Sequence, residues 1–371
     1  MEVFLGLANA TIDLFGGDIS WVNVGGYVST DFRQQLDIDR TNYDIINQYR
    51  TADSEFFSLE SRLQSNGSGA FNWIFGGYYS ESRGNQSMVW DSGADARRLA
   101  LNGIPNNFAG LTNLVDRNKF TSKAAFADIS YDLTEQLRLA GGVRYNEDAL
   151  HVTRPVAGRQ LGVAQPAFDG ELSSDRLTWR ANAQFKLSPD ANLYATDSTG
   201  YRAGGLQPTN LVRPSYGPEQ MVNYELGAKL MLFDRRVRAN VALFRMDWRD
   251  VQITTVDRTT GLVFTDNAGK ARIQGVELDL AARVGRFDLT AGLSYLDNKI
   301  QEFVDSTGFD QSGKPLPDAA EFSSSVSVQY TQPLVGGTEG FVRGTFIHTT
   351  ERLEDLIEGG VGPGQYAPGY Q

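Results

Sequence analysis

The chain has 371 residues and a formal net charge of −11, with 45 acidic against 34 basic residues, so a nucleic-acid partner is not expected. It has no cysteine, which excludes a disulfide framework and a thiolate metal site. No apolar run approaches the roughly 20 residues of a transmembrane helix, and the start, MEVFLGLANATID, lacks the features of a signal peptide. A soluble acidic β protein and a membrane β-barrel both remain open.

Alternation of apolar and polar residues is the dominant pattern. Apolar residues fall on every second position in LRLAGGVRY (137–145), RLTWRANAQFKL (176–187), GVELDLAARV (275–284) and RFDLTAGLSY (286–295). A helix cannot keep every second residue on one face, so the pattern predicts strands.

Most of the predicted strands are about ten to twelve residues long, against a usual strand length of about five or six. The fourteen strands are expected at 6–14, 18–36, 54–64, 70–82, 119–132, 136–149, 175–187, 191–201, 220–232, 236–249, 271–283, 286–298, 322–331 and 339–349. Alternating segments of about this length match tilted strands that cross a bilayer.

Short and long connections alternate between these strands. The short ones are 15–18, 65–69, 133–135, 188–190, 233–236, 284–286 and 333–337. The long ones include 83–117, 150–174, 202–219, 250–269 and 299–321. Such alternation puts turns at one end and loops at the other end of an up-and-down sheet, and closure removes its exposed edges. The sequence therefore predicts an all-β fold, an antiparallel up-and-down transmembrane β-barrel with an apolar outer band.

Aromatic residues end several of the apolar faces, at Tyr131, Tyr145, Tyr295 and Tyr330. A ring with a polar tip is stable where hydrocarbon meets headgroups, so these positions suit a membrane-interface girdle. Taken singly, each tyrosine is better explained by the frequency of tyrosine in strands.

The polar end of one predicted strand, at residues 193–205, resembles a motif of a known family. The stretch LYATDSTGYRAGG (193–205) turns polar on both faces and then ends in glycine, as expected of a strand that leaves the hydrocarbon and rises into a loop. Asp197 falls where a bulky outward residue is expected. The stretch resembles a strand-to-loop motif of TonB-dependent outer-membrane receptors.

Three further stretches resemble the same family in the same order: FFSLESRLQSNGSGAFNWIFGGYYSE from residue 56, PEQMVNYELGAKL (218–230) and NAGKARIQGVELDL (267–280). The signature residues are Tyr194, Gly200, Tyr201, Arg202, Gly204, Gly205, Asn223, Tyr224, Glu225, Gly227, Asn267, Gly269, Gly275 and Glu277.

The resemblance implies a domain organisation. Residues 1–371 correspond to a partial receptor barrel, with about fourteen of the family's 22 strands. The family's N-terminal plug domain, its TonB box and its closing strands find no counterpart, so an internal fragment of a receptor is expected.

The resemblance also implies a function. Members of the family bind a scarce ligand at the surface of a Gram-negative cell and import it across the outer membrane, without covalent chemistry. The expected ligand is a ferric siderophore, and cobalamin, haem or an oligosaccharide stay open. Expected partners are outer-membrane lipid and lipopolysaccharide, and the TonB–ExbB–ExbD complex, which acts through the plug and TonB box. No enzyme activity and no cofactor are expected.

Loop arginines and aromatics suit an anionic, aromatic iron chelate through charge-assisted and cation–π contacts. The candidates are Trp90, Arg97, Arg98, Phe108, Arg202, Gln207, Arg213 and Tyr216. The alternative for any single one of them is an ordinary loop side chain with no role in binding.

No catalytic or metal constellation stands out. His151 and His348 are better explained as surface or lumen residues than as ligands or bases. The acidic stretch DIDRTNYD (37–44) has oxygen ligands for Ca²⁺ but lacks the glycine and distal glutamate of an EF-hand loop, which favours a solvated loop.

Two other functions remain as alternatives. A passive porin has the same barrel without plug or energy coupling. A soluble β-rich enzyme or lectin would pack its apolar faces inward and stay monomeric without detergent.

Overall fold

The computed structural model describes residues 2–37, 42–93, 95, 112–160, 163–210, 212–256, 263–305, 308–355, 365–367 and 369. None of the helices in this part is long and apolar enough to span a membrane. The two that it contains are single 3₁₀ turns, η1 (Phe15–Gly17) and η2 (Val335–Gly337).

One antiparallel sheet dominates the described part, and its long strands follow one another in chain order. They are β1 (Glu2–Leu14), β2 (Ile19–Asp37), β3 (Ile46–Ser65), β4 (Phe71–Ser92), β5 (Asn113–Asp132), β6 (Leu137–Arg154), β9 (Phe168–Ser188), β10 (Ala191–Arg202), β13 (Glu219–Leu232), β14 (Val237–Val256), β15 (Val263–Val284), β16 (Phe287–Glu302), β17 (Phe322–Pro333) and β18 (Glu339–Thr349). All fourteen predicted strands are therefore confirmed.

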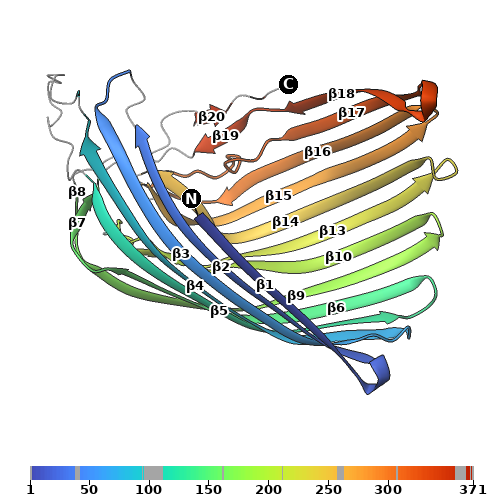
Figure 1. Cartoon of the computed structure of the whole chain (residues 1–371), viewed down its shortest axis with the longest axis horizontal. Helices are drawn as coiled ribbons and strands as arrows, with labels where there is room; N and C mark the ends of the chain where they lie inside the picture. Colours follow the sequence, from blue (N-terminus) through green and yellow to red (C-terminus); the bar gives the residue numbers. More distant parts are fainter. Residues whose placement is uncertain are drawn as a thin grey trace.

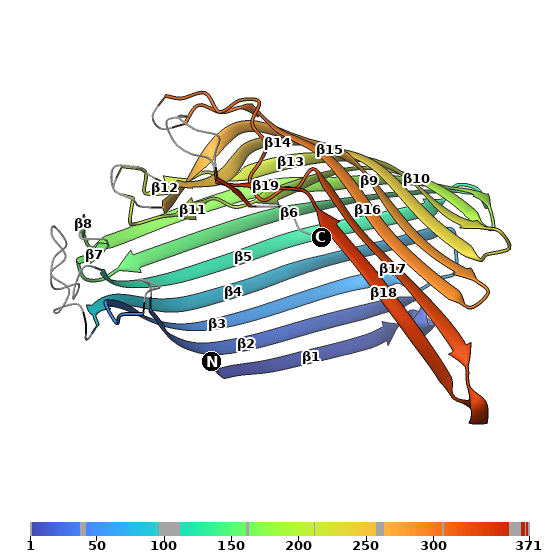
Figure 2. The same cartoon turned by 90° about the horizontal axis from the view of Figure 1, so that it is seen from above.

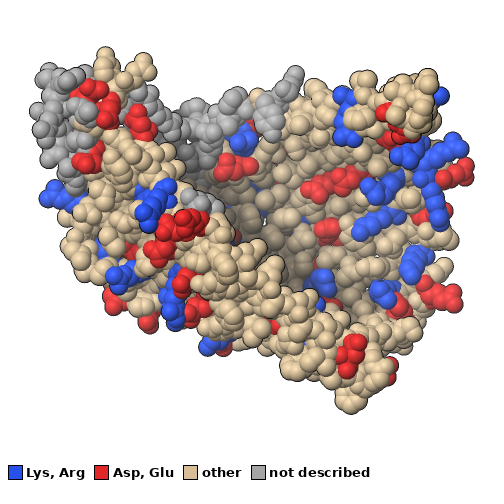
Figure 3. Space-filling view, in the orientation of Figure 1, with Lys and Arg blue, Asp and Glu red and all other residues tan. Residues whose placement is uncertain are grey.

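The sheet curls around a hollow, with β1 and β18 as its two edges (Figures 1 and 2). The short turns gather at one end and the longer loops at the other end (Figure 1). The space-filling view shows the hollow with both positive and negative side chains around it (Figure 3). We call the face that lines this hollow the inner face, and the opposite face the outer face.

The predicted strands are too short at their loop ends. β4 runs to Ser92 rather than 82, β14 runs to Val256 rather than 249, and β9 begins at Phe168 rather than 175. Both faces are polar in most of these extensions, so the apolar alternation stops while the backbone ladder continues. The predicted loops at 83–117, 150–174 and 250–269 are correspondingly shorter.

Short strands also lie within the predicted loops. They are β7 (Gly158–Gln160), β8 (Val163–Gln165), β11 (Gly205–Leu206), β12 (Ser215–Tyr216), β19 (Arg352–Asp355) and β20 (Gln365–Ala367). β11 pairs with β12 and folds the loop after β10 into a small hairpin. Two-residue strands carry too little alternation to be predicted from the sequence.

An apolar band covers the outer face. On β16 it runs over alternate residues from Phe287 to Tyr295, and the register aligns it with Val276 and Leu278 on β15. Tyr131, Tyr145 and Tyr295 are exposed at its margins, where the sequence predicts a girdle. The inner face carries polar residues such as Glu225 and Glu277, so the sheet has the two faces of a barrel wall.

A small apolar cluster lies at the loop end of β14–β16. It contains Val251, Ile253, Ala271, Ile300, Phe303, Leu316 and Leu353. The loop after β16 contributes two of these residues, and Asp305 stabilises that loop by accepting hydrogen bonds from the Phe309 N–H and Gln311 Nε2 at 3.0 and 2.7 Å. Burial of this cluster explains why β14 and β15 extend beyond their predicted ends.

Candidate functional site

A pocket of about 770 Å³ opens on the inner face, below the loop that joins β10 to β13. Strands β4, β5, β6 and β9 supply one side of it, and Arg202, Gly204 and Tyr216 supply the other side. The pocket therefore lies at the loop end of the hollow, where a molecule that arrives from the loops first meets the wall.

Arg144 gives this pocket its main cationic group. Its Cζ atom lies 5.2 Å from the ring centroid of Tyr78 and 5.6 Å from that of Phe126. Its Nε donates a hydrogen bond to Asn146 Oδ1 at 2.7 Å. Two aromatic faces and one amide thus fix the guanidinium while leaving N–H groups for an anionic ligand.

Polar side chains and aromatic rings surround Arg144. Ser80, Ser122, Asn146, Asp148 and Thr178 line the same pocket on the inner faces of β4–β9. The aromatic rings of Tyr78 and Phe120 contribute flat apolar surface. This combination suits a planar ligand with oxygen donors and negative charge.

The loop above the pocket is held in place by Glu219 and Gln252. Glu219 forms two 3.0 Å contacts with the Arg202 guanidinium and accepts the Gln252 N–H at 2.7 Å. Gln252 Nε2 donates to the carbonyls of Ala203 and Gly217, at both ends of the loop. The Arg202 guanidinium is therefore paired with the nearly buried carboxylate of Glu219.

Asn267 fixes the far end of the same loop. Its Oδ1 accepts the Gly217 N–H at 2.7 Å, and its Nδ2 donates to the carbonyls of Gly217 and Asp250. An amide that accepts from one peptide group and donates to two carbonyls acts as a bridge between β15, the loop and the end of β14. This gives the signature residue Asn267 a structural role.

The glycines of the signature allow close approach in the loop. A Cβ atom on Gly204 would lie 2.4 Å from the Tyr216 carbonyl oxygen, and one on Gly205 would lie 2.2 Å from the Tyr216 hydroxyl. Both distances are too short for a side chain. Tyr216 can therefore pack across β11 only because residues 204 and 205 lack side chains.

The eight predicted ligand-binding residues have different environments. Arg202 and Tyr216 line the pocket. Gln207 instead hydrogen-bonds the backbone of Arg213 and Thr265, and the Arg213 guanidinium pairs with Asp266. Gln207 and Arg213 thus stabilise the loop.

Trp90 lies at the loop end of β4, where its backbone N–H donates to the Thr112 carbonyl. It is not among the residues that line the pocket. The remaining three candidates, Arg97, Arg98 and Phe108, lie outside the described residues.

The structure also shows the surroundings of the two histidines and of the acidic stretch at 37–44. His151 Nε2 lies 2.7 Å from Asp169 Oδ1 on the outer face, and the His348 ring stacks on Phe346 with centroids 6.4 Å apart. In the acidic stretch at 37–44, Asp44 Oδ1 accepts a hydrogen bond from Asn47, and residues 38–41 lie outside the described residues. Within the described part of the chain, no group of three or more acidic or histidine side chains is arranged to hold a metal.

Arg144, Tyr78 and Asp148 are site residues that the sequence did not single out. Each occupies the polar face of an ordinary strand, as many other residues do. Only the strand register, which brings β4, β5, β6 and β9 together, selects them.

One carboxylate in the loop after β16, Asp310, has a perturbed pKa. Hydrogen bonds from the Ser312 hydroxyl and N–H hold the pKa of Asp310 below its usual range, and the N–H to Oδ1 distance is 2.9 Å. Because the folded pKa is depressed, this contribution to stability is present above the unfolded pKa and is lost as pH falls through the folded value. Acidification below about pH 4 is expected to loosen residues 308–314 in wild type but not in Asp310→Asn, which hydrogen exchange measures. Equal protection at neutral and acid pH in wild type would contradict this.

Comparison with known proteins now identifies the class of protein. Residues 5–371 match the family described as TonB dependent receptor-like, beta-barrel. The chain belongs to this family, and its fold is the antiparallel transmembrane β-barrel of TonB-dependent receptors, as the sequence predicts.

Individual relatives share about 30% sequence identity with the chain, over part of its length. The chain is 31% identical over 160 residues to the pesticin receptor of Yersinia enterocolitica, a match that covers 42% of this chain and 23% of that receptor. It is 28% identical over 216 residues to a probable TonB-dependent receptor, BfrD, of Bordetella pertussis, covering 55% and 27% of the two chains. The chain thus spans about a quarter of the length of these curated relatives.

Solved structures agree on the fold. The ferric yersiniabactin uptake receptor FyuA from Yersinia pestis superposes with a TM-score of 0.74 at 18% identity, over 95% of this chain and 50% of that chain. The ferric-catecholate import receptor Fiu from Escherichia coli gives a TM-score of 0.67 at 16% identity, over 99% and 56% of the two chains.

Proposed function

We propose that the chain is the barrel part of an outer-membrane receptor that binds a ferric siderophore at the cell surface and imports it with energy supplied through TonB. The observation that carries the proposal is the family match over residues 5–371 together with a cationic, aromatic pocket at the loop end of the barrel. Relatives named as receptors for metal-pseudopaline and for a catecholate siderophore support an iron or metal chelate as the ligand.

In this proposal the pocket around Arg144 is the first binding site on the inner wall. The guanidinium, oriented by Tyr78, Phe126 and Asn146, contacts the anionic oxygens of the chelate. Arg202 acts indirectly, because its pairing with Glu219 holds the loop that covers the pocket.

A plug domain and the TonB–ExbB–ExbD complex complete the proposal. A plug in the hollow would block free diffusion, and force transmitted through TonB would open a path past it. The chain covers 50% of the FyuA chain, which leaves room for such a domain in a longer protein.

We further propose lipopolysaccharide as the lipid partner at the loop end of the outer face. Arg83, Arg117 and Lys119, together with Asp53 and Glu55, line an outward depression of about 350 Å³ on β3 to β6, beyond the apolar band. Glu81 contacts both Arg83 and Lys119, at 2.7 and 3.1 Å. Cations at this level suit the phosphates of a surface glycolipid.

Chelate binding tests the role of Arg144. The purified chain in detergent is titrated with ferric yersiniabactin or a ferric catecholate, and tryptophan fluorescence is recorded. Arg144→Ala is expected to weaken binding about tenfold, the loss of one charge-assisted contact of about 1.4 kcal/mol.

Arg180→Ala is the matched control. Arg180 is another inner-face arginine, paired with Asp128 at 2.6 Å and absent from the pocket lining. Equal weakening in both variants would show a diffuse electrostatic effect and would rule out the pocket as the binding site.

The second candidate is a passive porin, favoured by the open hollow of the described part (Figure 3). In planar bilayers a porin predicts steady conductance of the complete protein. A plugged receptor predicts a closed state.

A further inference from the structure

A second pocket, of about 350 Å³, adjoins the pocket around Arg144. Both pockets are lined by Arg202 and Gln252, so these two side chains form the boundary between them. We call the second one the apolar pocket, because most of its lining side chains are apolar. They are Trp248, Val251, Ile253, Ile273, Leu316, Pro317 and Ala319.

Strand register places the apolar pocket on the inner face. Asp247 pairs with Arg272 at 2.7 Å on the outer face, which they share with Val276 of the apolar band. Trp248 follows Asp247 on β14, and Ile273 follows Arg272 on β15. Since side chains alternate between the two faces of a sheet, Trp248 and Ile273 face inward. A molecule in the first pocket can therefore reach the apolar pocket without leaving the hollow.

The far wall of the apolar pocket is a fixed part of the loop after β16. Asn298, which is only 7% exposed, accepts the Leu316 N–H at 2.7 Å and donates to the Ala319 carbonyl at 3.4 Å. The Asp318 N–H donates to the Leu353 carbonyl at 2.7 Å. These bonds shape the pocket before any ligand arrives, which lowers the entropy cost of binding.

The charged side chains of the two pockets favour different groups. The first pocket is lined by two bases and one acid, Arg144, Arg202 and Asp148. The apolar pocket is lined by one base and two acids, Arg202, Glu219 and Asp318. Arg202 pairs with Glu219, and Arg352 lies 3.8 Å from Asp318, so these acids are compensated. An anionic group is therefore favoured in the first pocket and an uncharged, apolar group in the second.

The boundary between the pockets presents apolar surface. The Arg202 side chain is 59% exposed, although its guanidinium pairs with Glu219. Its aliphatic stem is therefore a surface over which a chain can pass from one pocket to the other. Gln252 is held beside it by hydrogen bonds from Nε2 to the carbonyls of Ala203 and Gly217.

We infer that the ligand is an amphiphilic chelate, with an anionic metal-binding head at Arg144 and one uncharged alkyl or acyl tail in the apolar pocket. The tail packs on Trp248, Ile273 and Pro317, which keep part of their surface exposed. The inference rests on the proposed function, because the head is the chelate that is assigned there to the first pocket.

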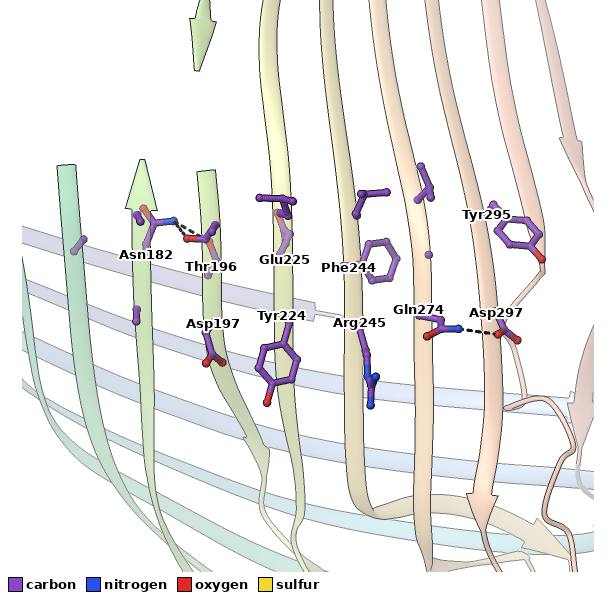
Figure 4. Close-up of a pocket in the computed structure, with 18 of the residues that line it drawn as sticks. Asn182, Thr196, Asp197, Tyr224, Glu225, Phe244, Arg245, Gln274, Tyr295 and Asp297 are labelled. Atoms are coloured by element: carbon purple, nitrogen blue, oxygen red, sulfur yellow. Dashed lines mark hydrogen bonds between the residues drawn. The ribbon is translucent and has the colours of Figure 1, made fainter. Parts of the chain in front are cut away.

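The outer face offers a competing place for such a tail. A groove of about 1070 Å³ crosses β9 to β16 there, with Asp197 on its polar side (Figure 4). Leu226 and Leu243 in its wall are 57% and 49% exposed. In a membrane-embedded barrel this face meets lipid, so a tail that simply enters the membrane or the detergent would contact the groove. Variants of both places are needed to separate them.

A pair of chelates tests the tail. The purified chain in detergent is titrated with gallium complexes of a tris-catecholamide whose terminal amine carries an acetyl or an octanoyl group, and bound metal is counted. Each methylene buried in an apolar pocket strengthens binding by about fourfold. The octanoyl chelate is therefore expected to bind at least about tenfold more tightly than the acetyl chelate. Equal affinities would overturn the inference, whereas failure of the acetyl chelate to respond to Arg144→Ala would count against the proposed function alone.

Filling each site locates the tail. Ala319→Phe fills the apolar pocket and is expected to reduce the preference for octanoyl to below about twofold. Ala281→Phe, on the inner face of β15 outside both pockets, is the matched control and is expected to keep the preference. Ala195→Phe fills the outer-face groove and is also expected to keep it. Uptake of the tail into micelles cancels, because all variants share one detergent. A preference that survives Ala319→Phe, or that Ala195→Phe abolishes, would overturn the assignment.

Contact quenching gives a readout that needs no pocket-filling variant. A bromine at the end of the octanoyl tail quenches the fluorescence of a tryptophan that it touches. The brominated gallium chelate is expected to quench more than the plain one, and Trp248→Phe is expected to remove this difference. Trp179→Phe, on the outer face of β9 two residues from the groove residue Ala181, is expected to leave it unchanged. If Trp179 rather than Trp248 carries the quenching, the tail lies on the outer face and the inference is wrong.

Discussion

Gly275→Ala is expected to destabilise the barrel wall by about 3 kcal/mol, although it adds a single methyl group. A Cβ atom on Gly275 would lie 2.3 Å from the Tyr295 carbonyl oxygen and 3.0 Å from the Phe244 ring. The carbonyl belongs to the β15–β16 ladder, which runs from Lys270 to Val284 on β15. The added methyl can be accommodated only by moving that backbone.

Urea unfolding of the chain refolded into lipid vesicles, followed by tryptophan fluorescence, measures this loss. Gly292→Ala is the matched control. Gly292 lies on the inner face of the neighbouring strand β16, but its Cβ would meet only Asp279 Oδ1, at 3.6 Å. The control is expected to lie within about 0.5 kcal/mol of wild type. If both variants unfold at the same urea concentration, close packing at Gly275 is not what selects glycine there.

Asp116→Ala is expected to cost about 3–5 kcal/mol, because it leaves a buried arginine without its partner. The Arg154 side chain is fully buried and donates to Asp116 through Nε and Nη2, at 2.7 and 2.9 Å. Its Nη1 contacts the Gln165 side chain and the Pro208 carbonyl. The same arginine thus joins β5, β8 and the loop over the pocket.

Unfolding and limited proteolysis measure two consequences of Asp116→Ala: lower global stability, and faster cleavage within residues 203–218. Adding Arg154→Met is expected to restore most of the stability, since the buried charge is removed together with its partner. Glu302→Ala, which breaks the exposed Lys270–Glu302 pair, is expected to cost less than about 1 kcal/mol. Equal losses in Asp116→Ala and Glu302→Ala would show that burial of the pair is unimportant.

The strand order was predictable because a bilayer imposes a period of two over long segments. Residues 286–295 show this best, since their apolar positions are the outer face of β16. Above the band no such constraint acts, so strand ends such as Ser92 and Val256 could not be located. There the ladder continues through polar residues or through an apolar cluster buried under a loop.

The site was less predictable, because its contacts join residues far apart in sequence. Arg202 and Arg213 are attractive ligand residues in the sequence, but their acids lie 17 and 53 residues away. Arg144 sits on a polar strand face, and only the pairing of β5 with β6 brings Phe126 beside it. Of the signature residues, Glu225 accepts a hydrogen bond from the Tyr194 hydroxyl and Asn267 accepts one from the Gly217 N–H, contacts that the sequence does not reveal.

Uptake of radioactive iron as a siderophore chelate, by cells that carry the complete receptor gene, tests the central claim most directly. Uptake is expected to end when TonB is deleted and to fall several-fold with Arg144→Ala, while Arg180→Ala transports normally. Uptake that continues unchanged without TonB would show a passive pore and would contradict TonB-dependent import.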